Sequence, residues 1–478
     1  MPTTNGNRKL LDLKRWEFCT PAPAATAAGA FVVSSQHSRQ QQLYVTSNTT
    51  AWLYLPEEDG WVALASPALA GTFGAGACGA SCAFSTGTTT AAASLTATAG
   101  TTSTITTNQT LARDLRGYSV HILAGPNAGV TLPIVSNTIG ATAVITVAAQ
   151  ASAFSASTVY RLITPRWFVV GAGTLAAGSF RQYDFATNTW TSLSITGLPA
   201  TLGTDGRLVS TSSWDFTAYM SIATGTATAG GASTLTNTGK AWTVNQWTNY
   251  QIRITGGTGA GQIRTIASNT ATVITVSAAW TTAPDATSTY SIEGNDDFLY
   301  YMGNNAVALY RYSISANTWT TLSPTAARAA APGAGMSGHW VYNTGDAAWA
   351  DEANIINGRR IYSLRGAAGS VLDYYDIALN TWVSGVSYSP GAETFTTGTS
   401  YALIGGSLYI QKEATGRFFR LNFVTGEMDG WSTITYTQGA AVLGDTTWMV
   451  QYVDGSTTIR YVYKLLNTST VVLRQMVV

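Results

Sequence analysis

An eight-residue unit with an aromatic residue, a turn and a tryptophan recurs along the chain at fixed internal spacing. The clearest copies are 183–190, 312–319 and 375–382, a looser copy is 54–61, and a lengthened one is 421–431. A short alternating apolar run precedes each copy, and Asn-Thr or Asp-Gly stands before the tryptophan. These turn residues tolerate positive φ, so each copy predicts strand, loop, strand, tight turn and strand. Repeats of this kind indicate one supersecondary unit per copy.

A strand followed by Tyr-Asp-x-x-x-Asn-x-Trp closely resembles the Kelch repeat, in which each copy forms one four-stranded blade of a β-propeller. The match is best at Tyr183 to Trp190 and at Tyr375 to Trp382. The Gly-Gly doublet of that family stands in the right place only at Gly405-Gly406, so the resemblance is to an outlying Kelch-like branch. The resemblance implies an all-β Kelch-like propeller.

Six segments are candidate blades, which predicts about six blades, with the two ends of the chain sharing the terminal sheet. Their cores lie near 43–65, 167–194, 298–323, 359–385, 407–433 and 447–474. Aromatic residues of the repeated unit are predicted to be buried in the blade cores: Trp61, Trp190, Trp319, Trp382, Trp431, Tyr183, Tyr312 and Tyr375.

A second, longer repeat lies between blade candidates. The segment from Gly117 aligns with the segment from Asn249, through Tyr118 with Tyr250 and Gly129 with Gly261. Each copy holds several alternating runs separated by Gly or Asn turns, which predicts a small antiparallel β barrel or sandwich. We therefore expect an N-terminal segment with the first blade, a first inserted domain, one blade, a second inserted domain and the remaining blades. The ranges are 1–86, 87–165, 166–221, 222–294 and 295–478.

Composition supports strands and argues against several partners. Only 10% of the residues are charged, against a typical quarter, and helical surfaces usually need those charges. The formal charge is +1 with no run of like charge, so specific nucleic-acid binding is not expected. No stretch reaches about 18 consecutive apolar residues, and the first residues lack an apolar signal core. We therefore expect no membrane insertion and no Sec export.

Catalytic and metal-binding patterns are missing from the sequence. The histidines are His37, His121 and His339, each without a ligand at metal spacing, and Cys19, Cys78 and Cys82 are interpreted as small buried residues. The acidic groups are Glu57-Glu58-Asp59, Asp296-Asp297 and Asp351-Glu352. The first two are interpreted as turn charges and the third as a loop, with a bound-ion site as the alternative. The glycine-rich 256–261 is interpreted as a hairpin turn. We therefore predict that the chain is not an enzyme and binds no cofactor or metal. For the same reason a Kelch-type oxidase or hydrolase is disfavoured.

The second copy of the longer repeat resembles a β module of tailed-bacteriophage structural proteins. The resemblance is carried by Trp242-Thr-Val-Asn245-Gln246-Trp247, followed by Gly261-Gln-Ile-Arg264 and Ser268-Asn-Thr270. It implies a virion structural protein, assembled in the host cytoplasm and associated with the tail as a nozzle, hub or collar component. The implied partners are the chain itself, in a ring such as a hexamer, and other virion proteins.

The alternative is a receptor-binding fibre or glycan-binding propeller. In that case exposed aromatic side chains would hold a host-surface glycan, and Trp242, Trp247 and Trp280 are the candidate contact or glycan surface. Exposure of these three residues would favour the alternative. Burial of the same residues between subunits would favour the structural role.

Overall fold

The fold is described from a computed structural model of the 478-residue chain. The structure describes residues 16–26, 29–35, 41–46, 50–64, 76–82, 95–211, 223–295, 297–341, 360–369, 371–387, 393–404, 407–412, 415–423, 427–434, 446–454, 457–466 and 468–477. The elements that these residues form are strands, together with the short 3₁₀ helix η3 (Gly366–Ala368), so the all-β prediction is confirmed.

Six four-stranded antiparallel sheets form the six blades of a β-propeller. Blade 1 is β2 (Phe31–Ser34), β3 (Gln42–Val45), β4 (Ala51–Leu55) and β5 (Gly60–Ala63). Blade 2 is β6 (Cys78–Cys82), β14 (Arg166–Val170), β16 (Phe180–Asp184) and β17 (Thr189–Ser192). Blade 3 is β19 (Arg207–Ser210), β27 (Phe298–Met302), β28 (Leu309–Ser313) and β29 (Thr318–Thr321).

The remaining blades complete the ring. Blade 4 is β30 (His339–Val341), β31 (Arg360–Leu364), β32 (Val371–Asp376) and β33 (Thr381–Ser387). Blade 5 is β34 (Ser400–Ile404), β35 (Ser407–Lys412), β36 (Arg417–Asn422) and β37 (Met428–Thr433). Blade 6 is β38 (Thr447–Asp454), β39 (Thr457–Leu465), β40 (Val472–Val477) and β1 (Glu17–Phe18). A short pair, β15 (Gly173–Thr174) with β18 (Thr201–Leu202), lies outside the blades.

The ring closes through the innermost strands and through the two ends of the chain. Each innermost strand contacts the next one along the series β38, β2, β6, β19 and β30. On the other side of blade 6, β34 contacts β38. Between β30 and β34, the rings of His339 and Tyr401 lie 5.8 Å apart. The N-terminal β1 pairs with the C-terminal β40, Glu17 opposite Arg474, so the two ends share one sheet as predicted.

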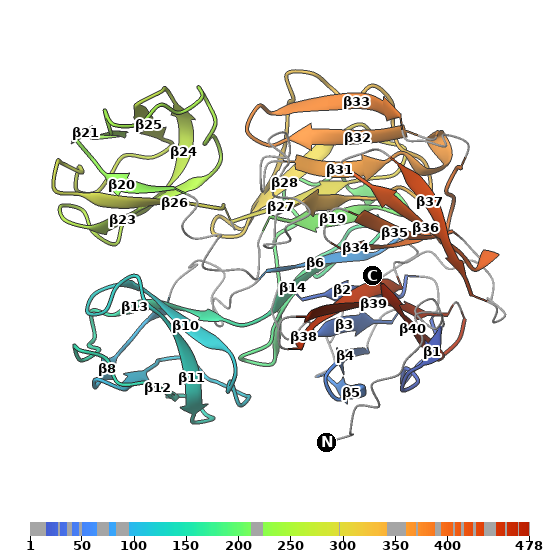
Figure 1. Cartoon of the computed structure of the whole chain (residues 1–478), viewed down its shortest axis with the longest axis horizontal. Coiled ribbons are helices and arrows are strands. Elements are labelled where there is room, and N and C mark those ends of the chain that lie inside the picture. Colours follow the sequence, from blue (N-terminus) through green and yellow to red (C-terminus); the bar gives the residue numbers. More distant parts are fainter. Residues whose placement is uncertain are drawn as a thin grey trace.

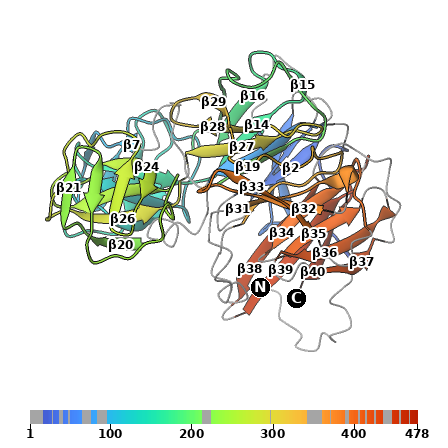
Figure 2. The same ribbon diagram turned by 90° about the horizontal axis from the view of Figure 1, so that it is seen from above.

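The segments of the longer repeat form two seven-stranded sheets with the same strand order. In the first inserted unit the order is β7 (Leu95–Thr96), β13 (Val159–Ile163), β10 (Ser119–Ala124), β11 (Thr131–Asn137), β12 (Val144–Val147), β9 (Thr104–Thr106) and β8 (Ala99–Gly100). In the second it is β20 (Ala223–Thr226), β26 (Thr289–Glu293), β23 (Gln251–Gly256), β24 (Ile263–Asn269), β25 (Val273–Val276), β22 (Thr234–Thr236) and β21 (Ala229–Gly231). Figures 1 and 2 place both units on one side of the propeller.

Each unit is inserted inside a blade, whereas the sequence placed the two copies between blade candidates. The first unit separates β6 from β14, and the second separates β19 from β27, yet each strand pair hydrogen-bonds in full register. Irregularities in register also recur at equivalent places, between Ile122 and Ala124 and between Ile254 and Gly256. Such β-bulges are features of a common design, which supports a duplicated origin.

The repeated unit forms the outer hairpin of a blade, and its geometry explains the spacing of its residues. In three copies a tyrosine hydroxyl donates a hydrogen bond to the side-chain oxygen of an asparagine five residues later, at 2.7–2.8 Å. These asparagines, Asn188, Asn317 and Asn380, have φ between 48° and 52°. The tyrosine and tryptophan stand opposite each other on neighbouring strands, as Tyr312 and Trp319 do. In blade 1, Asp59 replaces the asparagine and accepts from Tyr54 at 2.6 Å.

Replacing Asn317 by alanine should lower the free energy of unfolding by about 2 kcal/mol, because alanine resists the left-handed conformation and cannot accept hydrogen bonds. Asn317 Oδ1 accepts from Tyr312 Oη and from the backbone N–H of Ser194, 2.9 Å away. Glycine adopts positive φ without strain, so the Asn317→Gly variant should lose less free energy of unfolding than the alanine variant. Chemical denaturation of both variants measures the difference, and a glycine variant as unstable as the alanine variant would contradict the role of φ.

Candidate functional site

The first inserted unit is held against blade 2 through the turn of the repeated motif. Nη2 of Arg113 donates to Tyr183 Oη at 3.0 Å and to Asn188 Oδ1 at 2.9 Å. The guanidinium lies 5.0 Å from the centre of the Phe185 ring, and the ring of Tyr118 packs against Phe185 as well. The buried apolar residues of this unit continue into those of blades 1 and 2 as one core. The unit is therefore fixed to the propeller.

In blades 1 and 3 the same turn forms hydrogen bonds with the segment that follows the preceding blade. Trp319 Nε1 donates to Ser194 O at 3.2 Å, joining blade 3 to the segment that follows blade 2. Thr20, which follows β1 of blade 6, donates its N–H to Asp59, and Trp61 Nε1 donates to Thr20 O at 3.1 Å. The turn is thus a general docking point, and at blade 2 it binds a side chain of the inserted unit.

The second inserted unit touches blades 3 and 4 and also the first unit. Asn249 Nδ2 donates to Ile377 O at 2.9 Å, and Asn249 Oδ1 accepts from Arg311 at 3.3 Å. A Cβ added to Gly261 would lie 2.8 Å from Cβ of Ala124 in the first unit, and Gly261 has φ of +87°. Glycine is needed at this contact both for its conformation and for the close approach.

His121 lies at this contact between the two units. Its Nδ1 is 2.7 Å from Thr131 Oγ1. Burial, followed by the nearby charges of Arg253 and Arg161, lowers the pKa of His121 to about 3. The imidazole is therefore neutral in the folded protein at pH values where an unfolded chain, with a pKa of about 6.5, takes up a proton.

This difference in the pKa of His121 predicts a loss of stability in acid. The contribution is complete above pH 6.5 and is lost as the pH falls from about 6.5 toward 3, at roughly 1.4 kcal/mol per pH unit. Between pH 6.5 and pH 5 the wild type should therefore lose about 2 kcal/mol more than a His121→Gln variant. Denaturation at both pH values measures this, and parallel losses in the two proteins would refute it.

Two of the three tryptophans predicted to form a contact or glycan surface lie in the core of the second unit. Trp247 and Trp280 are each 6% exposed and belong to the core of the second unit. Trp242 is half-buried against that core, with its ring 6.4 Å from that of Tyr290. The prediction is wrong for Trp247 and Trp280, because their indole rings fill the interior of the unit that carries them.

The blade tryptophans differ in burial. Trp319 and Trp382 are buried as predicted, whereas Trp61 and Trp190 are only half-buried, so the prediction of burial is not met at these two. The side chain of Trp431 lies outside the described residues. The tyrosines fit the prediction, since Tyr183, Tyr312 and Tyr375 are all buried.

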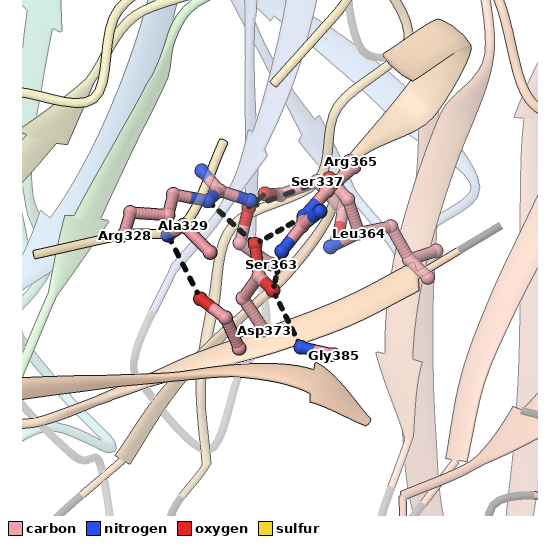
Figure 3. A network of polar contacts seen from close by, with 9 residues as sticks. Arg328, Ala329, Ser337, Ser363, Leu364, Arg365, Asp373 and Gly385 are labelled. Atoms are coloured by element: carbon pink, nitrogen blue, oxygen red, sulfur yellow. Dashed lines mark hydrogen bonds and ion pairs between the residues drawn. The ribbon is translucent and has the colours of Figure 1, made fainter. Parts of the chain in front are cut away.

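Asp373 of β32 is the centre of a buried polar network in blade 4 (Figure 3). Its carboxylate accepts from Arg328 Nε at 2.6 Å, from Arg365 at 2.9 Å and from the N–H of Gly385 at 3.2 Å. Arg328 also donates to Ser363 Oγ at 2.9 Å. Burial lowers the pKa of Arg328, while Asp373 acts in the opposite direction. Arg328 belongs to the segment between β29 and β30, so the network ties that crossover to blade 4.

Innermost strands of three successive blades bring Arg207, His339 and Tyr401 together. Arg207 pairs with Asp205 at 3.2 Å, and its guanidinium lies 5.7 Å from the Tyr401 ring. Burial and the charge of Arg207 lower the pKa of His339 to about 3. The sequence analysis missed this group because its members lie far apart along the chain. Within the described residues, no group of three or more His, Cys, Asp and Glu could hold a metal ion.

The other candidates from the sequence fall into structural roles or outside the described residues. Asp297 accepts hydrogen bonds from Ser313 and Ser315 in a turn of blade 3. Strands β23 and β24 pair directly, which confirms 256–261 as a hairpin turn. Cys19, Cys78 and Cys82 are buried, as the sequence predicted. His37, Asp296, Asp351 and Glu352 lie outside the described residues.

A pocket of about 140 Å³ lies where the first inserted unit meets the propeller. Part of its wall is formed by Leu53 and Pro56 of blade 1, Tyr118 of the inserted unit and Phe185 of blade 2, and Glu58 lies at its exposed edge.

Among the described helices, none is long and apolar enough to cross a membrane.

No protein-family model and no curated protein matches the sequence. Similar solved structures include a chain of a mitotic checkpoint complex, with 8% identity and a TM-score of 0.36 over 100% of this chain and 95% of that one. YCF48 bound to D1 peptide has 7% identity and a TM-score of 0.32 over 99% and 96%. A protein of unknown function from Bacteroides thetaiotaomicron has 9% and 0.24 over 75% and 90%. The six-bladed architecture rests on the strand pairing of this chain itself.

Proposed function

We propose that the chain is a structural protein of a tailed-bacteriophage virion, assembled in the host cytoplasm. It acts in the tail, as a nozzle, hub or collar component, through protein–protein contacts and without catalysis. Its blades are Kelch-like, and each inserted unit is a small antiparallel barrel or sandwich. Its partners are further copies of itself, in a ring such as a hexamer, and other virion proteins.

The observation that carries the proposal is the fixed attachment of two duplicated units to one side of the propeller. Arg113 and Asn249 each bind the propeller, and Gly261 brings the two units into contact. A symmetric ring needs the same rigid patch on every subunit, and fixed units supply such a patch. The residues that resemble a phage module, 242–247, lie in the second of these units.

Two of the three residues on which the receptor-binding or glycan-binding alternative was based do not support it. It required exposed aromatic residues on an inserted unit, whereas Trp247 and Trp280 are in the core of theirs. A Kelch-type oxidase or hydrolase needs a cluster of ligands or acids, and the group around His339 holds one histidine beside an arginine. Neither alternative is favoured by these residues.

Native mass spectrometry of the purified full-length chain tests the proposal, alone and mixed with tail components. A closed ring of six or twelve copies is the expected result. A trimer would contradict the nozzle or collar role and favour a fibre. A strict monomer under all these conditions would refute assembly through self-contacts.

A further inference from the structure

The pocket between the first inserted unit and the propeller has an apolar wall built by three separate parts of the chain. Leu53 and Pro56 come from blade 1, Tyr118 from the inserted unit and Phe185 from blade 2, and all four are buried. Ligand sites commonly have such an apolar lining with a few polar groups that set orientation. The pocket is therefore suited to a ligand with an apolar face.

Two buried polar atoms at this pocket have no hydrogen-bond partner in the described part of the protein. Gln41 is 4% exposed, and its Nε2 donates to Tyr118 Oη, whereas its Oε1 accepts nothing. Because Oε1 and Nε2 share one carbon, Oε1 lies beside Tyr118 at the pocket wall. Arg113 uses Nη2 for Tyr183 and Asn188, while its Nε is also buried without a partner. One acceptor and one donor are thus unmet, which is unfavourable unless a ligand pairs with them.

The edge of the pocket adds acceptors with negative charge. Glu57, Glu58 and Asp114 are exposed there, against the single positive charge of Arg113. Carboxylates accept hydrogen bonds from hydroxyl groups, and together they disfavour an anionic ligand. A lysine or arginine side chain could donate to these acceptors, but it has no acceptor for Arg113 Nε and would bring its charge to an apolar wall.

We propose that this pocket binds one ring of a neutral sugar. A hydroxyl group both donates and accepts, so a polyol can pair with Gln41 Oε1, with Arg113 Nε and with Glu58, while its C–H face packs on Tyr118 and Pro56. This ligand class meets the unpaired donor, the unpaired acceptor and the apolar wall together. The site goes beyond the proposed structural role and does not use the tryptophans of the second unit.

Binding of simple methyl glycosides to the full-length chain tests the proposal. The neutral probes are the glycosides of glucose, galactose, mannose and N-acetylglucosamine, and the glucuronide is the charged counterpart, all measured by titration calorimetry and saturation-transfer NMR. At least one neutral probe should bind. If methyl glucoside binds, methyl glucuronide should have an affinity about tenfold lower, because the acidic edge repels its carboxylate. The substitutions Gln41→Met and Glu58→Gln should each lower the affinity for the neutral probe by about tenfold. Glu427→Gln, an exposed acid of blade 5, is the matched control and should change nothing.

Melting curves of the variants show whether each remains folded, and Glu58 is exposed enough for its variant to fold normally. Absence of binding by every neutral probe at saturating millimolar concentration would overturn the proposal. Unchanged affinity in both Gln41→Met and Glu58→Gln would overturn the location. An oligolysine peptide whose binding is lost in Glu58→Gln, with no sugar bound, would replace the sugar by a protein partner. Ring formation in native mass spectrometry is read separately, so failure of this site and failure of the structural role are distinguishable.

Discussion

Replacing Asp373 by alanine is expected to lower the free energy of unfolding by about 3–5 kcal/mol, because the buried Arg328 and the partly buried Arg365 lose their shared counter-ion. The side chains of Arg328 and Asp373 are 1% and 0% exposed, and that of Arg365 is 12% exposed. Water cannot replace the carboxylate around Arg328, and the N–H of Gly385 loses its acceptor too. Denaturant unfolding followed by tryptophan fluorescence measures the loss.

A surface ion pair in blade 5 provides the matched control. Arg420 and Asp429 are joined at 2.6 Å, but their side chains are 35% and 53% exposed. Solvent screens this pair, so Asp429→Ala should change stability by no more than about 1 kcal/mol. Similar losses in the two variants would show that burial of the network around Asp373 does not determine its contribution.

The sequence predicted the hairpin of each blade because its residues lie close together along the chain. The spacing of Tyr312, Asn317 and Trp319 follows from one tight turn with positive φ, and any chain segment that forms this turn shows the same pattern. The duplicated units were predicted for a similar reason, since Tyr118 and Tyr250 stand directly before the equivalent strands β10 and β23. Patterns that are local in sequence are visible without the fold.

The insertion points could not be predicted in the same way. Strands β6 and β19 are short and lack the repeated unit, and each pairs with a strand on the far side of an entire inserted unit. The pairing is decided by contacts between distant residues, which alternation within a segment does not reveal. The innermost strands were therefore separated from their own blades in the sequence analysis.

The candidate site was missed for the same physical reason. Gln41, Arg113 and Phe185 come from blade 1, the first inserted unit and blade 2, and no spacing in the sequence connects them. Conversely, Trp247 and Trp280 were predicted to be candidates for a binding surface because each is a large aromatic residue among small polar ones. A small sheet needs such rings to fill its interior, so their presence alone cannot distinguish a core from a binding surface.

Replacing Trp319 by alanine is expected to destabilise the protein by about 3–5 kcal/mol, more than the same change at Trp190. Trp319 is 4% exposed, its ring lies 5.0 Å from that of Phe180 in blade 2, and its Nε1 donates to Ser194 O. Its removal therefore leaves a cavity between two blades and an unpaired carbonyl.

Trp190 occupies the equivalent position in blade 2 but is half-buried, with its ring 5.1 Å from that of Tyr183. Water can reach the space that its ring leaves, so Trp190→Ala should lose only about 2 kcal/mol. The two variants share the motif, the strand position and the paired tyrosine, which makes them a matched pair for denaturant unfolding. A loss at Trp190 equal to that at Trp319 would mean that the hairpin pair, rather than burial between blades, sets the stability of a blade.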